Sequence, residues 1–323
     1  MQRLFILGAG ASKAGGIPAL KELSGYIAEK PGVARFMREL FAVNSQLAHG
    51  AFLPRLDDIY SVVDYALFQD HRLGSFTQED LRTLRRELNL SICRLFAKDT
   101  AKADYAGSVD IYRRFARELN MGQDAVLTLN WDTALDYVLE CEKGWALNYG
   151  FTGTIQHGFP LVKLHGSVNW AWCEACTQLN VTGYDFKDWE KMNCQTCGET
   201  KLSPLLVGPT VLPRHKDTPL ENCWLAAIKL IIQAERLYFI GLSLDAIDLG
   251  VFEMIKRGLL LNKKKPELFV LGHGFQATPK RKELLANGTV KRYIQLFGVD
   301  IGFYMQGFQG TIPGDVEFTR LRS

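Results

Sequence analysis

The feature that most constrains the fold is a short apolar run that ends at glycine or polar residues and occurs five times along the chain. The first run is Arg3–Leu7, which leads directly into Gly8-Ala9-Gly10-Ala11-Ser12. The four later runs share this layout: 125–129, 161–164, Arg236–Ile240 and Glu267–Leu271. Strands of this kind alternating with helical stretches predict an α/β fold with a doubly wound, Rossmann-like parallel sheet. Ligands bind such sheets beyond the carboxyl ends of the strands.

Residues 54–120, between the first two runs, have helical composition instead. Thr77 is a typical helix cap, and the segments 57–68 and 109–119 also suit helices. Apolar residues follow Thr77 at three- and four-residue spacing, as one buried helix face requires: Leu81, Leu84, Leu88, Ile92 and Leu95. We expect a helical insertion here, with an enlarged strand-to-strand crossover as the alternative.

Four of the seven cysteines form two CxxC pairs, Cys173 with Cys176 and Cys194 with Cys197. Four thiolates at this spacing match a tetrahedral structural zinc site, whose full shell leaves no position for catalysis. The pattern also favours a reducing compartment over a secreted disulfide framework. We therefore predict a small zinc module over 171–203. The other cysteines stand singly among apolar residues and are expected to be buried core thiols: Cys93, Cys141 and Cys223.

Composition places the chain among globular proteins. Its 323 residues are 47% apolar and 23% charged, which allows a sizeable core and excludes a largely disordered chain. A net charge of +3 is too small to favour nucleic acid as a partner. The most apolar stretch, 224–244, contains Lys229, Glu235 and Arg236, which a bilayer centre tolerates poorly. We expect a soluble, cytoplasmic protein with no membrane contact.

The glycine turn after the first run is a candidate phosphate site. Gly8 and Gly10 would let the backbone approach a pyrophosphate. The next glycines are Gly15 and Gly16, so the spacing departs from GxGxxG and a common dehydrogenase is disfavoured. A tight turn that only connects strand to helix is the alternative.

Polar residues after two later runs are the second candidate. Asn130 and Asp132 stand on alternate positions beyond one run, and His165 follows the next. Each residue alone suits a structural role with a backbone partner. Their joint placement beyond the carboxyl ends, together with the glycine turn, predicts a functional site.

In order along the chain, these motifs resemble the sirtuin (Sir2-like) family, and more closely its divergent bacterial defence-type branch. The similarity spans nearly the whole chain apart from 54–120. The matching pieces are GAGAS at 8–12 with Gly16-Ile17-Pro18, TLNWD at 128–132, KLHGS at 163–167, both CxxC pairs, FIGLSLDAID at 239–248 and RYIQLFGVDIGFY at 292–304. The resemblance implies an NAD-binding Rossmann-like domain made of 1–53, 121–170 and 204–323, alongside the helical insertion 54–120 and the zinc module 171–203.

The resemblance also implies residue roles. The residue matching Asn130 orients the ribose or a water, the one matching Asp132 helps to hold the nicotinamide end, and the one matching His165 is the general base. The implied NAD-binding residues are Gly8, Ala9, Gly10, Ser12, Asn130, Asp132, Gly241 and Ser243. The shared chemistry is cleavage of the nicotinamide–ribose bond. Preorganised dipoles and a carboxylate can stabilise the oxocarbenium-like ribose, and a neutral imidazole can accept a proton.

The sequence differs from deacylating sirtuins at positions that the family uses to bind and react with the acylated peptide. Deacylating sirtuins carry Asp-Phe-Arg where this chain has Ala19-Leu20-Lys21, and Leu129 replaces the usual glutamine. The phenylalanine–glycine pair of the acyl-lysine channel is not apparent in 205–213. These changes favour water as the nucleophile. We therefore predict an NAD+ glycohydrolase that releases nicotinamide and ADP-ribose, acting as an NAD-depleting antiphage defence effector.

Two other functions stay open. The zinc pairs and the KLHG sequence favour an NAD-dependent protein-lysine deacylase. Leu129 and the altered 19–21 segment suit a non-enzymatic NAD or ADP-ribose-binding regulatory subunit. For the hydrolase we expect a homo-oligomer, with activation by a protein partner or by self-assembly, because no separate sensor domain is apparent.

Overall fold

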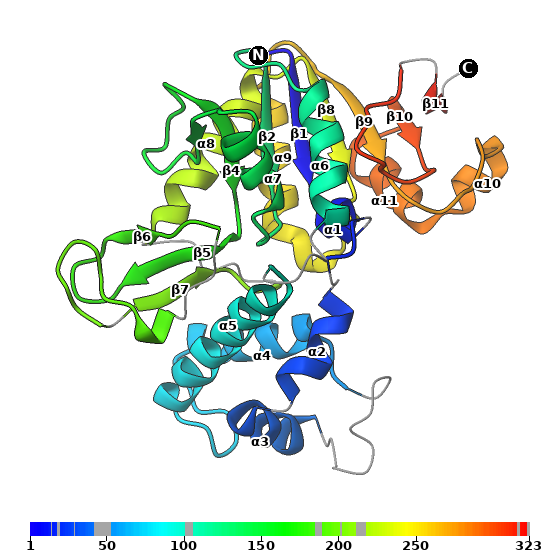
Figure 1. Ribbon diagram of the computed structural model, residues 1–323. Helices are drawn as coiled ribbons and strands as arrows, with labels where there is room; N and C mark the ends of the chain where they lie inside the picture. Colours follow the sequence, from blue (N-terminus) through cyan, green and yellow to red (C-terminus); the bar gives the residue numbers. More distant parts are fainter. Residues whose placement is uncertain are drawn as a thin grey trace. The chain divides into compact units, whose positions relative to one another are not determined.

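The computed structural model describes residues 1–13, 15–17, 20–28, 30–41, 53–100, 106–184, 189–200, 202–210, 218–314 and 317–321. The chain divides into two compact units, whose elements are labelled in Figure 1. Unit 1 contains Met1–Ile17, Tyr105–His165 and His215–Ser323, and unit 2 contains Pro18–Asp104 and Gly166–Arg214.

Unit 1 is built on a sheet with the strand order β11-β10-β9-β8-β1-β2-β4-β3. Its strands are β1 (Arg3–Leu7), β2 (Asp124–Thr128), β3 (Leu147–Asn148), β4 (Phe159–Lys163), β8 (Arg236–Ile240), β9 (Glu267–Leu271), β10 (Ile301–Tyr304) and β11 (Thr319–Arg320). All pairings are parallel except that of β10 with β11. β1 lies between β2 and β8, so the strand order reverses at β1 and creates a switch point. This confirms the predicted doubly wound α/β fold.

The predicted strand positions agree closely with the structure. β1, β8 and β9 coincide with the predicted runs, whereas β2 and β4 begin one or two residues earlier than predicted and end one residue earlier. The residues after these two strands still pair, since Leu129 N donates to the Leu7 carbonyl and Leu164 N to the Thr128 carbonyl. They lie beyond the regular ladder, where the chain turns away from the sheet.

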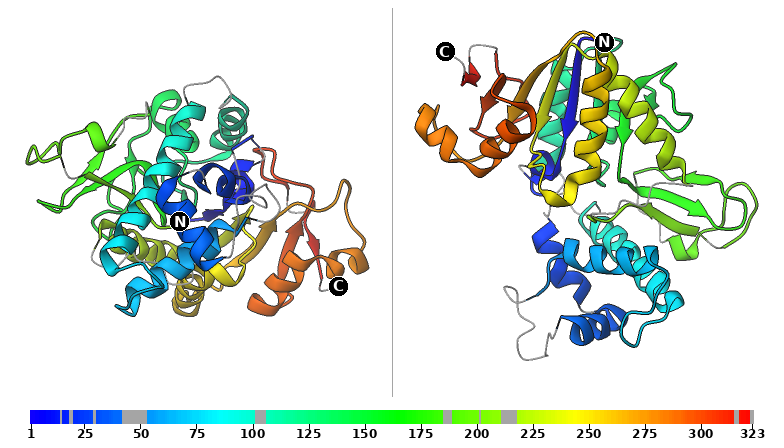
Figure 2. Two further views of the ribbon diagram at one scale, coloured as in Figure 1. Left: turned by 90° about the horizontal axis from the view of Figure 1, so that it is seen from below. Right: turned by 180° about the vertical axis from the view of Figure 1, so that it is seen from behind.

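Helices cover both faces of the sheet in unit 1. They are α1 (Ala9–Lys13), α6 (Ala106–Glu118), α7 (Ala134–Tyr137), α8 (Pro219–Gln233), α9 (Leu249–Leu261), α10 (Arg281–Ala286) and α11 (Gly288–Phe297), with a π-helical turn at Val138–Glu142. Views from opposite sides show α6 on one face and α9 on the other (Figures 1 and 2).

Strand alternation explains which helix covers which face. Phe5 and Tyr238 are register partners on one face, and Phe5 packs edge-on against Phe115 of α6 at 5.2 Å between ring centroids. The next residue of β8, Phe239, points to the other face. It contacts Phe297 of α11 at 5.6 Å.

Unit 2 combines a small antiparallel sheet with helices. Its strands, in the order β6-β5-β7, are β5 (Gly166–Cys173), β6 (Leu179–Val181) and β7 (Leu202–Leu206). Its helices are α2 (Leu20–Ala28), α3 (Pro31–Leu40), α4 (Leu56–Phe68) and α5 (Gln78–Thr100), with a 3-10 turn at Trp189–Lys191. Asn89 of α5 joins helices to sheet, because it accepts from the Tyr60 hydroxyl at 2.6 Å and donates to the Leu206 carbonyl at 3.2 Å.

The predicted cap and buried face of α5 are confirmed. Thr77 N donates to Asp80 Oδ2 at 2.9 Å, and Asp80 N donates to Thr77 Oγ1 at 3.2 Å. All five predicted face residues are buried: Leu81, Leu84, Leu88, Ile92 and Leu95. The helical character of 54–120 is confirmed over α4, α5 and α6, and α6 groups with unit 1. The three-part domain division stays a prediction.

Two of the three isolated cysteines follow the prediction. Cys93 and Cys223 are buried, whereas Cys141 is exposed and its predicted core position is wrong. Val138 and Leu139 fill the buried side of the π-helical turn, which leaves Cys141 on the outer side. Among the helices described, none is both long and apolar enough to cross a membrane.

Candidate functional site

The carboxyl ends of the central strands bring the predicted residues of unit 1 to one edge of the sheet. Leu7 of β1 is in register with Thr128 of β2, and Thr128 with Lys163 of β4. Asn130 and His165 each follow by two residues. They therefore leave the sheet at a common edge, beside the turn that follows β1 at the switch point.

The glycines of this turn allow the backbone after β1 to pack closely against the backbone after β8. Gly8 N donates to the Ile240 carbonyl and Gly10 N to the Gly241 carbonyl, both at 2.9 Å. A Cβ on Gly8 would lie 2.6 Å from the Gly241 oxygen, and a Cβ on Gly241 would clash with the backbone nitrogen of Ala11. Gly241 also has a φ of +61°. Close packing of the two backbone segments thus explains why glycine stands at positions 8 and 241. Ala9 and Gly10 in the same turn remain exposed.

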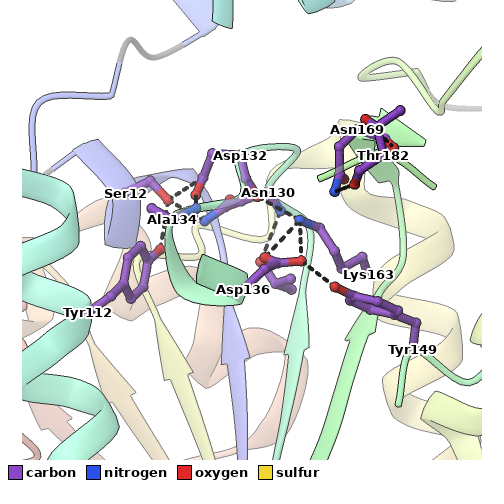
Figure 3. A network of polar contacts seen from close by, with 11 residues as sticks. Ser12, Tyr112, Asn130, Asp132, Ala134, Asp136, Tyr149, Lys163, Asn169 and Thr182 are labelled. Atoms are coloured by element: carbon purple, nitrogen blue, oxygen red, sulfur yellow. Dashed lines mark hydrogen bonds and ion pairs between the residues drawn. The ribbon is translucent and has the colours of Figure 1, made fainter. Parts of the chain in front are cut away.

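A buried hydrogen-bond cluster joins three predicted site residues around Ser12 (Figure 3). Ser12 Oγ lies 2.7 Å from Asn130 Nδ2, 2.8 Å from Asp132 Oδ2 and 2.8 Å from the Tyr112 hydroxyl. Asn130 Nδ2 also donates to the Gly8 carbonyl at 3.0 Å. All four side chains are buried, which fixes the Asn130 amide and the Asp132 carboxylate to the glycine turn.

The environment of Asp132 works against its charge. Burial raises the pKa of Asp132, because desolvation outweighs the positive charge of Lys163 and the hydrogen bonds from Ser12 and from Ala134 N. The nearby Asp136 raises this pKa further. Burial likewise raises the pKa of Tyr112, so its hydroxyl stays protonated.

A buried ion pair lies beneath this cluster and was missed by the sequence analysis. Lys163 Nζ donates to the Asp132 carbonyl at 2.6 Å and to Asp136 Oδ2 at 3.1 Å. Tyr149 donates its hydroxyl to Asp136 Oδ1 at 3.0 Å. A lysine inside the apolar run LVKL was a usable signal, since a charge in a buried strand requires a partner. Nothing in the sequence marked Tyr149 or Tyr112.

His165 and Ser243 occupy the loops after β4 and β8. His165 is half-buried, and its ring is inclined by 30° to that of Trp224 on α8, with centroids 6.5 Å apart. Trp224 Nε1 donates to the Leu164 carbonyl at 2.9 Å, which ties α8 to the residue before His165. Ser243 is half-buried and donates to Asp245 Oδ2 at 3.0 Å.

The four predicted metal ligands form a cluster in unit 2. The sulfurs of Cys173 and Cys197 are 3.6 Å apart, as are those of Cys176 and Cys194. All four lie within 4.8 Å of one another. Zn–S bonds of about 2.3 Å give a tetrahedron with edges of about 3.8 Å, so the cluster fits a structural zinc ion.

The backbone around the cysteines supports this assignment. Thr177 N donates to the Cys173 carbonyl and Gly198 N to the Cys194 carbonyl, so each CxxC pair closes in a tight turn. The backbone amides of Cys197 and Thr196 and the Asn180 side chain lower the pKa of Cys194 to about 6 against the opposing effect of burial. Burial raises the pKa of its neighbour Cys176, so Cys194 is the thiolate of this pair. A thiolate at this position suits a metal ligand.

Two sequence departures lie partly outside the described residues. Ala19 and residues 211–213 are not among them, and of Leu20 and Lys21 only the backbone is described. Leu129 is described and buried.

Comparison with known proteins finds no family model and no curated protein that matches the chain. Solved Sir2 structures are similar to it at low identity. A Sir2 homologue–NAD complex is 13% identical over 96% of this chain and 85% of that chain, with a TM-score of 0.47. A Sir2 protein bound to acetylated peptide is 15% identical over 91% and 92%, with a TM-score of 0.42. A sirtuin solved to explain substrate affinity is 16% identical over 84% and 83%, with a TM-score of 0.43.

Proposed function

We propose that the protein binds NAD+ and hydrolyses its nicotinamide–ribose bond, releasing nicotinamide and ADP-ribose. The observation that carries this proposal is the buried cluster of Ser12, Asn130 and Asp132 at the β1 switch point. Dinucleotides bind at such switch points. A carboxylate and an amide held rigidly beside a glycine turn can stabilise the positive charge that develops on the ribose when its bond to a cationic nicotinamide breaks.

Cleavage of the nicotinamide–ribose bond is favoured by negative charge close to the ribose. Loss of neutral nicotinamide leaves an oxocarbenium-like ribose, which a carboxylate held in place before the reaction can stabilise. Asp132 is held by Ser12 on one oxygen and by Ala134 N on the other. Its charge therefore has a fixed position and needs no reorganisation during the step.

Asn130 suits the orientation of a hydroxyl or a water. Both described hydrogen bonds of its side chain use Nδ2, which donates to the Gly8 carbonyl and to Ser12 Oγ. The carbonyl oxygen Oδ1 then serves as an acceptor for a ribose hydroxyl or for the attacking water. We assign the general base to His165, because histidine is the side chain that most often serves this role.

Release of nicotinamide tests this function. We would mix purified protein with NAD+ and follow nicotinamide and ADP-ribose by chromatography, with and without an acetylated peptide. We expect peptide-independent release that falls by at least about a hundredfold in Asn130→Ala and His165→Ala, because general-base catalysis alone contributes about that much. Asn169→Ala is a matched control, because it also removes a hydrogen-bonded asparagine side chain, but one that lies in unit 2. Asn169 donates to the Thr182 carbonyl at 3.0 Å (Figure 3).

The alternatives are separate outcomes of the same assay. Release only with peptide, together with an acetylated ADP-ribose product, would establish a deacylase. Binding of NAD+ without release would establish a binding subunit. Full release in both Asn130→Ala and His165→Ala would contradict the proposed mechanism.

We further propose a cytoplasmic, NAD-depleting defence role for this hydrolase, with a protein partner or self-assembly as the activator. The proposal follows from the resemblance in the sequence and from the proposed reaction. The same Asn130→Ala variant tests it. Phage-infected bacterial cells that carry the wild-type protein would lose NAD, whereas cells that carry the variant would retain it.

A further inference from the structure

We propose that Tyr112 is a positioning residue of this site. Its hydroxyl donates to Ser12 Oγ and thereby commits the single Ser12 proton to Asp132, which keeps that carboxylate ionised. The catalytic importance of this arrangement rests on the proposed NAD+ cleavage. The arrangement of protons itself does not depend on that function.

The direction of each hydrogen bond follows from counting protons around Ser12. Asn130 Nδ2 is an amide nitrogen and only donates, so it occupies one acceptor position of Ser12 Oγ. An ionised Asp132 only accepts, so the Ser12 proton points to Asp132 Oδ2. The bond between Ser12 and Tyr112 then has one remaining donor, the Tyr112 hydroxyl.

This order opposes protonation of Asp132. A proton on Asp132 Oδ1 would displace the hydrogen bond from Ala134 N. A proton on Oδ2 would be donated to Ser12, whose own proton would have to turn toward Tyr112, and the Tyr112 proton would have to leave that bond. The change would reverse two hydrogen bonds in a buried site, where an unsatisfied polar group is costly. When Asp132 is charged, the Ser12 proton points to Asp132 and the Tyr112 proton points to Ser12, and this order favours the charged form.

The other charged groups near Asp132 come from different elements. Lys163 on β4 supports its charge and Asp136 on α7 opposes it. Ala134 N, at the start of α7, donates to Oδ1 at 3.1 Å. Tyr112 is the contribution of α6, and it acts through Ser12 of α1.

Packing holds Tyr112 in place. Phe115 follows it one turn later on α6 and packs against Phe5 of β1 and against Phe308 at 5.5 Å between centroids. β1 leads through Gly8 into α1, which contains Ser12. The same strand thus anchors both the helix that supplies the donor and the residue that accepts from it.

The test removes the Tyr112 hydroxyl and measures the charge state of Asp132 directly. Carboxylate carbon chemical shifts would be followed by NMR as a function of pH in protein without NAD+, with the Asp132 signal assigned from Asp132→Asn. We expect the Asp132 midpoint to lie at higher pH in Tyr112→Phe than in wild type. Tyr60→Phe is the matched control, because it removes a buried tyrosine hydroxyl bonded to Asn89 in unit 2 and leaves the midpoint unchanged.

A double variant tests whether Tyr112 acts through Ser12. Ser12→Ala also raises the midpoint, and adding Tyr112→Phe to it causes no further change, because neighbouring groups that act through one another are not additive. An Asp132 midpoint that is unchanged in folded Tyr112→Phe would overturn the proposal, as would full additivity of the two variants.

Nicotinamide release gives the second readout. In Tyr112→Phe we expect the acid limb of the pH–rate profile to move to higher pH, with kcat on that limb reduced roughly five- to tenfold and KM unchanged, as loss of about one hydrogen bond to a charged network implies. If wild type fails to cleave NAD+ while the NMR midpoint shifts, the proposed function fails and the assignment of Tyr112 stands. Cleavage without a midpoint shift overturns the Tyr112 assignment alone.

Discussion

At the residue scale, Gly241 shows how backbone geometry restricts the site. It adopts a φ of +61°, and a Cβ there would clash with Ala11 N. We expect Gly241→Ala to lower the free energy of unfolding by about 2 to 4 kcal/mol, measured by urea denaturation. Gly122→Ala is the control, because Gly122 has a φ of +85° with no atom within 4 Å of the added Cβ. It should cost only about 1 kcal/mol. Equal losses in the two variants would show that the close loop contact contributes nothing.

The place of each residue in the fold determined whether it could be predicted as part of the site. The shared position of Asn130 and Asp132 was predictable because both follow a recognisable strand, whereas Ser12 was predicted from the family resemblance. Tyr112 was not predictable, because it lies on a helix whose sequence gives no sign that one hydroxyl reaches Ser12 of α1, 100 positions away. Contacts of that kind depend on how α6 packs on the sheet, which depends on Phe115 and Phe5.

At the element scale, the buried strand β4 contains the charged residue Lys163, which is stabilised by its ion pair with Asp136. Lys163 and Asp136 are fully buried and 3.1 Å apart. Lys163→Met would leave the Asp136 carboxylate buried without its cation, so we expect a loss of about 3 to 5 kcal/mol in the free energy of unfolding. Lys264→Met is the matched control, since its pair with Glu235 is half exposed and should contribute less than about 1 kcal/mol. Adding Asp136→Leu to Lys163→Met should restore part of the loss, and a failure to do so would contradict an unpaired charge as the cause.

Whether an element could be predicted depended on how clear its pattern of apolar residues is in the sequence. Parallel strands and the α5 face were predictable, because continuous apolar runs and three- and four-residue spacing are local signals. The antiparallel strands β5, β6 and β7 were not predicted, because β6 has three residues and the run Gly166–Cys173 contains both polar and aromatic side chains. Their pairing depends on the turns at the cysteine pairs and on contacts with α5.

At the scale of the whole molecule, the two units differ in what stabilises them. Unit 1 has an eight-stranded, largely parallel sheet with helices on both faces, whereas the described sheet of unit 2 has three strands. A small module with little core of its own commonly depends on its metal for folding. The four-cysteine cluster lies at the end of β5, so zinc should stabilise this part of unit 2 specifically.

Removal of the metal tests this division. We expect one zinc ion per chain by elemental analysis. We also expect chelation to speed amide hydrogen exchange in β5, β6 and β7 by at least about a hundredfold, because zinc contributes several kcal/mol to modules of this type. Exchange over Arg3–Leu7 should not change, since β1 lies at the centre of the unit 1 sheet. Cys197→Ser should lose the zinc, whereas Cys141→Ser, which changes an exposed cysteine outside the cluster, should retain it. Full protection of β5, β6 and β7 in metal-free protein would show that the antiparallel sheet is stable without zinc, and that its packing on α5 is sufficient to stabilise it.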